Sequence, residues 1–250
     1  MAADPHVVGI IQARMGSSRL PGKILEEIAG VPMVMRVVER VQRAISLDGV
    51  VVATTTDPDD QAVFELLEHR DVDCLRGHPT DVLSRYLAAA KEFSADIIVR
   101  LTADCPLHDG DLIDKTVNAF LKKFPEVDYA SNRLVRTYPI GLDVEVISRE
   151  ALEKAGREAD QDYQREHVTP YLYEVKGRAR LLSVVADDDY GHHRWTVDTP
   201  EDLEFVRQVY AHFSDQPHFS WREVLDLLER KPELIAINAH IKQRGFREVD

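Results

Sequence analysis

Residues 10–25 read IIQARMGSSRLPGKIL, in which an apolar, strand-like start leads into a loop rich in glycine, serine and basic residues. A loop of this kind after the first strand of an α/β sheet is a common phosphate site, because glycine lets backbone N–H groups come close to an anion. Arg14, Arg19 and Lys23 would add charge-assisted hydrogen bonds. The competing interpretation is a solvated turn with scattered surface charge. The loop matches neither the P-loop pattern nor GxGxxG, so neither a P-loop nor a dinucleotide-binding fold is indicated.

Beyond this loop the chain alternates between strand and helix patterns, which predicts an α/β protein with a mostly parallel central sheet flanked by helices. The rhythm changes after about residue 128, and we expect a small antiparallel addition around residues 130–185. No repeat or linker divides the sequence, so a single domain over 1–250 is expected. Strands are predicted at 6–12, 49–56, 96–106 (ending in a loop), 138–148, 178–186 and 194–197, and helices at 31–44, 57–70, 80–93, 109–124, 200–213 and 220–230.

Several helix starts carry specific signals. Asp57 is expected as an N-cap with Pro58 at the first helical position, and Pro32 in a first turn. Capping boxes are predicted for Thr199 with Asp202 and for Ser220 with Glu223.

The 250 residues carry a net charge of -13 and a pI of about 5.2, so a broad basic face for nucleic acid is not expected. No signal-peptide pattern or membrane-length apolar run occurs, and the only cysteines are Cys74 and Cys105. We therefore predict a cytoplasmic protein whose partners are neither nucleic acid nor membrane.

The string QARMGSSRLPGKIL at 12–25 resembles the ARxxSxRLPGKxL signature of the sugar-acid cytidylyltransferases. The closest resemblance is to the spore coat polysaccharide biosynthesis protein SpsF family, which is related to the 3-deoxy-manno-octulosonate and acylneuraminate cytidylyltransferases. It extends through RLTADCPL, YPIGLDVEV, REHVTPY and RWTVDTPEDL. The resemblance implies a Rossmann-like nucleotidyltransferase fold, transfer of CMP from CTP to a sugar or sugar acid with release of pyrophosphate, Mg²⁺ as cofactor, and a homodimer.

Two aspartates follow predicted strands, at the edge where open α/β sheets bind ligands. Asp104 and Asp198 match the family's metal-binding aspartates, and carboxylates are common Mg²⁺ ligands. A turn or cap role is the alternative for both, although Thr199 already supplies a cap beside Asp198. By resemblance Arg14, Lys23 and Asp104 are the catalytic residues. The expected nucleotide-binding residues are Ala13, Arg14, Gly16, Ser17, Ser18, Arg19, Lys23, Thr54, Thr80, Asp81 and Arg85, with helix capping as the alternative for Thr80 and Asp81.

The sequence says less about which residues bind the acceptor sugar. Alternation along GLDVEV puts Asp143 and Glu145 on one face of a strand, where they could grip sugar hydroxyls or an amino group, or face solvent. This pair fits an amino sugar or an uncharged polyol better than an acid. A sugar acid would need a cation, for which Arg133, Arg136, Arg165 and His167 are candidates. The predicted substrate-binding residues are Arg133, Asp143, Glu145, Arg165 and His167.

Three other functions fit the sequence less well. A nucleotidyltransferase for another NTP would carry a different loop, since guanylyltransferases prefer a GGxSxRMGxDK-like pattern. A non-catalytic sugar-nucleotide binding protein would not need both aspartates. A metal-dependent glycosyltransferase would want a DxD motif, which DVD at 71–73 and DGD at 109–111 fit only loosely.

Overall fold

The computed structural model describes residues 4–216, 218–243 and 245. Seven strands form one sheet in the order β5-β4-β1-β6-β8-β7-β9, and β2 pairs with β3 in a separate hairpin. The strands are β1 (Val7–Gln12), β2 (Glu27–Ile28), β3 (Val31–Pro32), β4 (Gly49–Thr55), β5 (Cys74–Gly77), β6 (Ile97–Thr102), β7 (Tyr129–Ser131), β8 (Glu145–Ser148) and β9 (Leu181–Ser183). The α-helices are α1 (Met33–Val41), α2 (Gln61–His69), α3 (Val82–Glu92), α4 (Gly110–Leu121), α5 (Arg149–Glu158), α6 (Asp162–His167), α7 (Pro170–Tyr173), α8 (Pro200–His212), α9 (Trp221–Arg230) and α10 (Glu233–Ala236), and the 3₁₀ turns are η1 (Lys23–Leu25) and η2 (Pro58–Asp60).

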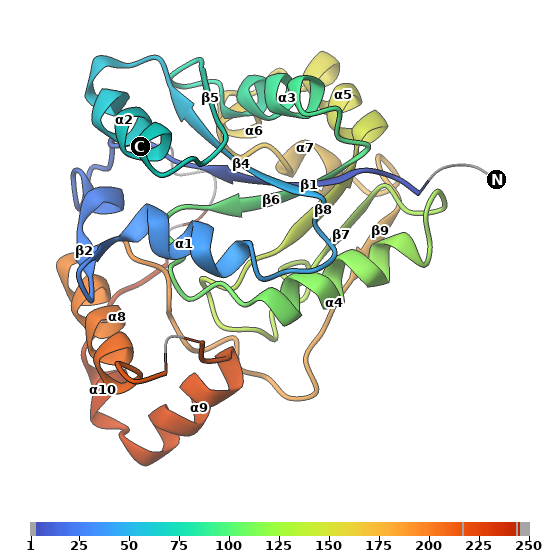
Figure 1. Ribbon diagram of the computed structural model, residues 1–250. Helices are drawn as coiled ribbons and strands as arrows, with labels where there is room; N and C mark the ends of the chain where they lie inside the picture. Colours follow the sequence, from blue (N-terminus) through green and yellow to red (C-terminus); the bar gives the residue numbers. More distant parts are fainter. Residues whose placement is uncertain (1–3, 217, 244, 246–250) are drawn as a thin grey trace.

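Helices cover both faces of the sheet (Figure 1). One apolar cluster joins the sheet to α1, α2, α4, α8 and α9, and a second joins it to α3, α5 and α7. The central strand β1 contributes to both clusters, with Val7 and Ile11 on one side and Val8 and Ile10 on the other. Such two-sided burial is typical of a parallel strand covered on both faces. The predicted mostly parallel α/β architecture is confirmed.

Strands β1, β4, β5 and β6 are mutually parallel, so their carboxyl ends meet at one edge. Strand β8 runs antiparallel to both β6 and β7, with Glu145 opposite Arg100. Its first residue therefore lies near the edge where the parallel strands finish. Residues 132–144, which join β7 to β8, are thereby brought beside the loop after β1.

The predicted caps are largely confirmed. Asp57 accepts a hydrogen bond from the N–H of Asp59, and Thr199 with Asp202 and Ser220 with Glu223 form capping boxes. Pro32 differs slightly, since it is the N-cap of α1 and lies just before the first helical turn.

The antiparallel addition expected around residues 130–185 is confirmed, because β8 runs antiparallel to β6 and β7, while β9 pairs parallel with β7. Two strand predictions need correction. The strand expected over 138–148 begins only at Glu145, so Leu142 and Val144 precede it although both are buried. The strand expected before Asp198 does not form in the described chain, because Arg194 makes only an isolated bridge with Ile140.

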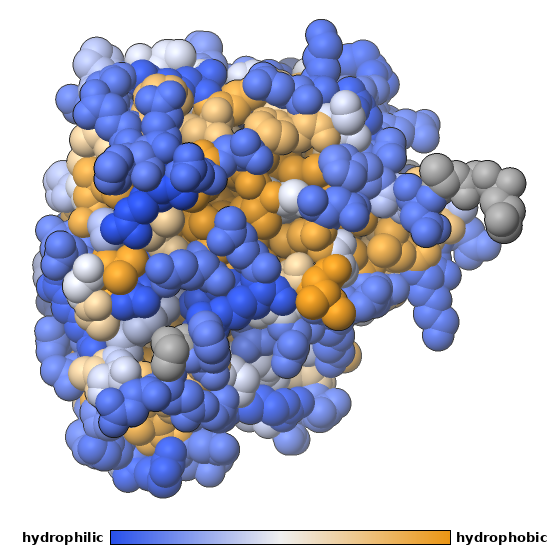
Figure 2. All heavy atoms as spheres, in the orientation of Figure 1, coloured by the Kyte–Doolittle hydropathy of each residue, from blue (hydrophilic) through white to orange (hydrophobic). Residues whose placement is uncertain are grey.

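On the face shown in Figure 2, hydrophobic residues gather over the middle of the sheet region, whereas mainly hydrophilic residues cover the part formed by α8 and α9. Among the described helices, none combines the length and apolar character required to cross a membrane.

Candidate active site

A cavity of about 440 Å³ opens at the carboxyl ends of β1 and β6. Its lining combines seven parts of the chain: the loop after β1, the end of β6 with the loop that follows, the start of α3, residues 133–145, helix α6, residues 196–198, and Gln243 with Gly245. This is the edge where open α/β sheets bind their ligands. The lining includes the sequence-predicted residues Ala13, Arg14, Gly16, Ser17, Arg19, Lys23, Arg85, Asp104, Arg133, Asp143, Glu145, His167 and Asp198.

The loop after β1 is closed on itself and tied to the neighbouring strand. Gly22 adopts a φ of 73° and donates its N–H to the carbonyl of Met15 at 3.0 Å. The N–H of Met15 in turn donates to the buried carboxylate of Asp60 at 2.6 Å. Ser17 Oγ accepts from the N–H of Leu20 at 3.3 Å. The loop is therefore held in a fixed conformation that places Lys23 at the start of η1.

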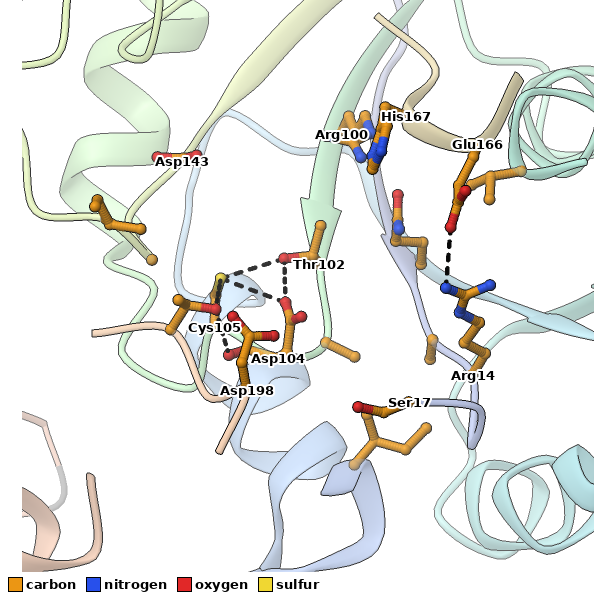
Figure 3. Close-up of a pocket in the computed structure, with 18 of the residues that line it drawn as sticks. Arg14, Ser17, Arg100, Thr102, Asp104, Cys105, Asp143, Glu166, His167 and Asp198 are labelled. Atoms are coloured by element: carbon orange, nitrogen blue, oxygen red, sulfur yellow. Dashed lines mark hydrogen bonds and ion pairs between the residues drawn. The ribbon is translucent and has the colours of Figure 1, made fainter. Parts of the chain in front are cut away.

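Lys23 joins the two predicted metal-ligand aspartates. Its Nζ donates to Asp104 Oδ2 at 2.9 Å and to Asp198 Oδ1 at 2.9 Å, and to the carbonyl of Val197 at 2.7 Å. Thr102 Oγ1 donates to the other oxygen of Asp104 at 2.7 Å. Residues about 80 and 175 positions from Lys23 along the chain thus meet at one point. Figure 3 shows the two aspartates close together beside Thr102 and Cys105.

The charges of this group are fixed by their contacts. Burial alone would raise the pKa of Asp104, but the Lys23 ammonium and the Thr102 hydrogen bond outweigh it and hold the pKa well below the ordinary value. Burial alone would likewise lower the pKa of Lys23, and the two carboxylates raise it instead. Asp104 is therefore an anion, and Lys23 a cation, at neutral pH.

Asp198 has two further cationic neighbours. Arg194 Nη2 donates to Asp198 Oδ2 at 2.8 Å, and Arg19 Nη2 lies 3.2 Å from Oδ1. Arg194 is also paired with the fully buried Asp202.

The donor set fits a hard divalent cation. Within the described ranges no group of three or more His, Cys, Asp or Glu side chains is arranged to hold a metal ion. Mg²⁺, however, is commonly held by one or two carboxylates together with substrate phosphates and waters. Asp104 and Asp198 supply two carboxylates that converge on the Lys23 ammonium, at the mouth of a loop suited to phosphates, so a bound cation would share them with Lys23.

The opposite wall of the cavity is built on a buried carboxylate. Glu145 is 1% exposed and pairs with Arg100 and, at 3.2 Å, with Arg133. Its other oxygen accepts from the hydroxyls of Tyr129 at 2.5 Å and Thr169 at 2.6 Å. Burial alone would raise the pKa of Glu145, but the two guanidinium groups lower it to about 2. The solvent-facing alternative for Glu145 is therefore wrong.

Asp143 is also paired within the protein, because the Arg136 guanidinium grips both its carboxylate oxygens. Across the cavity, Arg14 Nη2 donates to Glu166 Oε1 at 3.1 Å, which links the loop after β1 to α6 (Figure 3).

His167 is presented by a strained turn. Val168, which is fully buried, has φ 69° and ψ -55°, and the N–H of Thr169 donates to the carbonyl of His167 at 2.8 Å. This is the γ-turn with positive φ at its central residue, which is the rare and strained form and is unusual for a β-branched residue. The turn places His167 in the cavity lining, and the Thr169 hydroxyl donates to the Glu145 carboxylate. Burial, with Arg100 and Arg133 nearby, lowers the pKa of His167 to about 4, so the ring is neutral at pH 7.

Five predicted site residues lie outside the cavity lining. Asp81 caps α3 through the N–H of Ser84 and binds Arg165 at 2.6 Å, so these two charged groups satisfy each other. The capping alternative for Asp81 is thus what the structure shows. Thr54 is fully buried in β4, and both Ser18 and Thr80 are exposed.

Several lining residues were not identified from the sequence. Arg100 could have been recognised, because a single charged residue inside the apolar strand sequence IIVRLT needs a buried partner. Gln12 and Glu166 stand in the stretches QARMGSSRLPGKIL and REHVTPY, but neither was identified as a site residue, because their positions depend on which segments meet across the cavity.

Comparisons with known proteins agree with this geometry. Residues 8–225 match the family described as cytidylyltransferase. The chain is 37% identical over 246 residues to the uncharacterized protein MJ1063 of Methanocaldococcus jannaschii, covering 98% of this chain and 99% of the relative. It is 30% identical over 234 residues to the spore coat polysaccharide biosynthesis protein SpsF of Bacillus subtilis, covering 91% and 95%.

Two solved structures have the same fold. A cytidylyltransferase from Leptospira borgpetersenii superposes with a TM-score of 0.90 at 32% identity, covering 96% of this chain and 100% of that one. A CMP:2-keto-3-deoxy-manno-octonic acid synthetase complexed with CTP superposes with a TM-score of 0.64 at 23% identity, covering 83% and 99%. The expected resemblance is therefore confirmed, and the chain belongs to the cytidylyltransferase family of nucleotidyltransferases.

Proposed function

We propose that this enzyme transfers CMP from CTP to a hydroxyl of a sugar acid and releases pyrophosphate, with Mg²⁺ bound by Asp104 and Asp198. The observation that carries the proposal is the contact of Lys23 with both aspartates, directly beside the loop that holds Arg14 and Arg19. The match to the cytidylyltransferase family supports CTP as the nucleotide. The relatives' names support a role in surface polysaccharide synthesis.

The residues that would bind the CTP triphosphate are assigned from their charge and their position in the cavity. Attack on the α-phosphorus requires alignment and neutralisation of negative charge more than covalent help. Arg14, Arg19 and Lys23 line the cavity and hold the β- and γ-phosphates, and they stabilise the pyrophosphate that leaves. Mg²⁺, when bound, neutralises phosphate charge and lowers the pKa of the attacking hydroxyl. Arg85, whose guanidinium donates to the carbonyls of His78 and Pro79, keeps the loop before α3 at the cavity.

The acceptor side favours an acid. The wall contains the three guanidinium groups of Arg100, Arg133 and Arg136 and the two carboxylates of Asp143 and Glu145, which leaves one net positive charge. Both carboxylates are engaged by these arginines, so they are not available to grip an ammonium group. The preference for an amino sugar or polyol is thereby revised in favour of an acceptor with one carboxylate. The neutral His167 ring would bind a sugar hydroxyl.

The test is pyrophosphate release with each NTP, Mg²⁺ and a panel of neutral, amino and acidic sugars. CTP with an acidic sugar should give release, and Asp104→Asn should abolish it while the fold persists by circular dichroism. Asp111→Asn, an exposed acid in the first turn of α4, is the matched control and should keep full activity. Release with another NTP alone, or normal turnover by Asp104→Asn, would contradict the proposal.

We also propose a homodimer that uses the region around residues 130–185. Among the described residues, six large hydrophobic side chains are exposed, and Val135, Val175, Leu181 and Val185 fall in this region. Strand β9 is moreover an edge of the sheet, where unpaired backbone groups invite a second chain. Light scattering after gel filtration should give twice the chain mass of 28.4 kDa, and Leu181→Lys should give monomers. A monomeric parent protein would refute this assembly.

A further inference from the structure

A buried polar network lies behind Asp198, and it includes a residue beyond the last described helix. Asp202 is fully buried and accepts five hydrogen bonds. Two come from Arg194, at 2.9 Å each, and two from the backbone N–H groups of Asp198 and Thr199. The fifth comes from Asn238 Nδ2 at 2.9 Å. The same Nδ2 donates to the carbonyl of Arg194 at 3.0 Å.

This network contacts the Asp198 carboxylate through Arg194. Arg194 Nη2 binds Asp198 Oδ2, which leaves Oδ1 directed to the side where Lys23 and Asp104 lie. Asp202 holds the Arg194 guanidinium through both Nε and Nη2, so the fork cannot rotate. Asn238 links the two residues, because its Nδ2 donates both to Asp202 Oδ1 and to the backbone carbonyl of Arg194.

Asp202 therefore has two functions. In the capping box of α8 it receives the N–H of Thr199, and in the network it is the counter-ion of Arg194. Burial alone would raise its pKa, but the contacts with Arg194 and Asn238 lower it, so the counter-ion stays charged at neutral pH. Loss of a buried charge partner is costly, which makes Arg194 and Asp202 poor choices for substitution.

We infer that Arg194, Asp202 and Asn238 are positioning residues that fix the Asp198 carboxylate for divalent-metal binding. The inference rests on the proposed metal site of Asp104 and Asp198. Hydrogen-bonding partners of metal ligands typically alter metal affinity by tenfold or more when they are removed. The C-terminal part of the chain thus has a role in the site beyond packing.

The test uses Asn238→Leu, which keeps a similar volume and both charged pairs but removes the two donors. Titration calorimetry with Mn²⁺ on the full chain should show weaker affinity than in the parent protein, by up to about tenfold, because Asn238 acts on Asp198 through Arg194 and Asp202. The Mg²⁺ concentration for half-maximal pyrophosphate release should rise by a similar factor, with kcat at saturating Mg²⁺ within about twofold. Thr116→Val is the control, since it removes a buried side-chain hydrogen bond in α4 far from this network. It should lower Tm without changing Mn²⁺ affinity.

The outcomes separate the inference from the proposed function. If Asn238→Leu binds Mn²⁺ like the parent while Asp104→Asn does not bind it, the positioning role is refuted and the metal site stands. If the parent does not bind Mn²⁺ at all, both are refuted. Equal loss of affinity in Asn238→Leu and Thr116→Val would reduce the effect to general stability and would also overturn the inference.

Discussion

Glu145 is at the centre of the proposed acceptor wall of the cavity, which is formed by Arg100, Arg133, Arg136, Asp143 and Glu145. Its carboxylate has four partners from four different segments: Arg100, Tyr129, Arg133 and Thr169. Arg100, which is buried, would be left without its charge partner if the carboxylate were removed, whereas Arg133 would keep its pair with Asp143. Loss of one partner from a buried ion pair typically costs about 3–5 kcal/mol.

Glu145→Gln should therefore lower Tm at pH 7 and reduce acceptor affinity more than CTP affinity. The folded pKa of about 2 lies below the ordinary value of 4.5. A depressed pKa means that the carboxylate stabilises the fold fully above pH 4.5 and loses this effect as pH falls toward 2. Thermal scans across this window should show a fall in Tm for the parent that is smaller in Glu145→Gln.

Glu153→Gln is the matched control, because Glu153 forms an exposed pair with Arg149 at 3.0 Å. It should change Tm by no more than a degree or two, since exposed pairs contribute little. A Glu145→Gln protein as stable as this control would show that the buried network does not hold the wall.

At the scale of single residues, the sequence predicted most of the loop after β1 and most of the acceptor-side residues, whereas Thr54, Thr80 and Asp81 lie outside the cavity lining. Lys23 and Asp104 stand in an unusual motif and at a strand end, and each lines the cavity. Glu145 was recognised as a candidate, yet its burial could not be anticipated. Its four partners are spread between residues 100 and 169, and strand alternation says nothing of what lies opposite.

Among the elements, the loop after β1 is held by contacts outside itself. Asp60, at the end of η2, accepts from the N–H of Met15 and from the Thr55 hydroxyl. A charged hydrogen bond of this kind contributes about 1.5–3 kcal/mol. Asp60→Ala should loosen the loop, and we expect the KM for CTP to rise roughly tenfold while kcat changes much less.

Steady-state kinetics at saturating acceptor measures this effect. Asp57→Ala is the control, because Asp57 caps the same turn but does not contact the loop. A KM for CTP that is unchanged in Asp60→Ala, or raised equally in both variants, would show that the loop does not depend on this anchor.

The caps of α8 and α9 were predictable because they depend on residues three positions apart. An antiparallel addition around residues 130–185 was expected from the changed rhythm and is confirmed, but which strand there is reversed, and the absence of a strand before Asp198, were not predictable in the same way. Both depend on which segments pair across the sheet, and the apolar pattern of VEVIS is compatible with either direction.

In the molecule as a whole, the two walls of the cavity meet at Gly141. This residue has a φ of +104°, and a Cβ there would lie 2.5 Å from the backbone N of Thr196. Gly141 lies in the segment before β8, whereas Thr196 lies two residues before Asp198. The segment before β8 therefore packs directly against the segment that carries Asp198, the proposed metal ligand.

Gly141→Ala should lower Tm and reduce pyrophosphate release, because the clash must move the backbone of Trp195 and Thr196. The left-handed conformation alone costs a non-glycine residue about 1–3 kcal/mol. Gly177→Ala separates the two causes, since Gly177 also has a positive φ of 83° but nothing within 4 Å of the added Cβ. It should share the loss of Tm and keep full activity. Equal activities in Gly141→Ala and Gly177→Ala would show that the close packing of Gly141 against Thr196 does not affect activity.

The reversed direction of β8 has a consequence for how this enzyme could diversify. The phosphate loop leaves the sheet at the end of β1, whereas residues 132–144 enter it at the start of β8. In the proposed function, the donor is thus bound by chain that departs from the sheet, and part of the acceptor site is formed by chain that returns to it. An exchange of residues 132–144 that keeps Gly141 would leave the β1 loop and its Asp60 anchor untouched. Acceptor choice can therefore evolve as a separate module, with the nucleotide chemistry inherited unchanged.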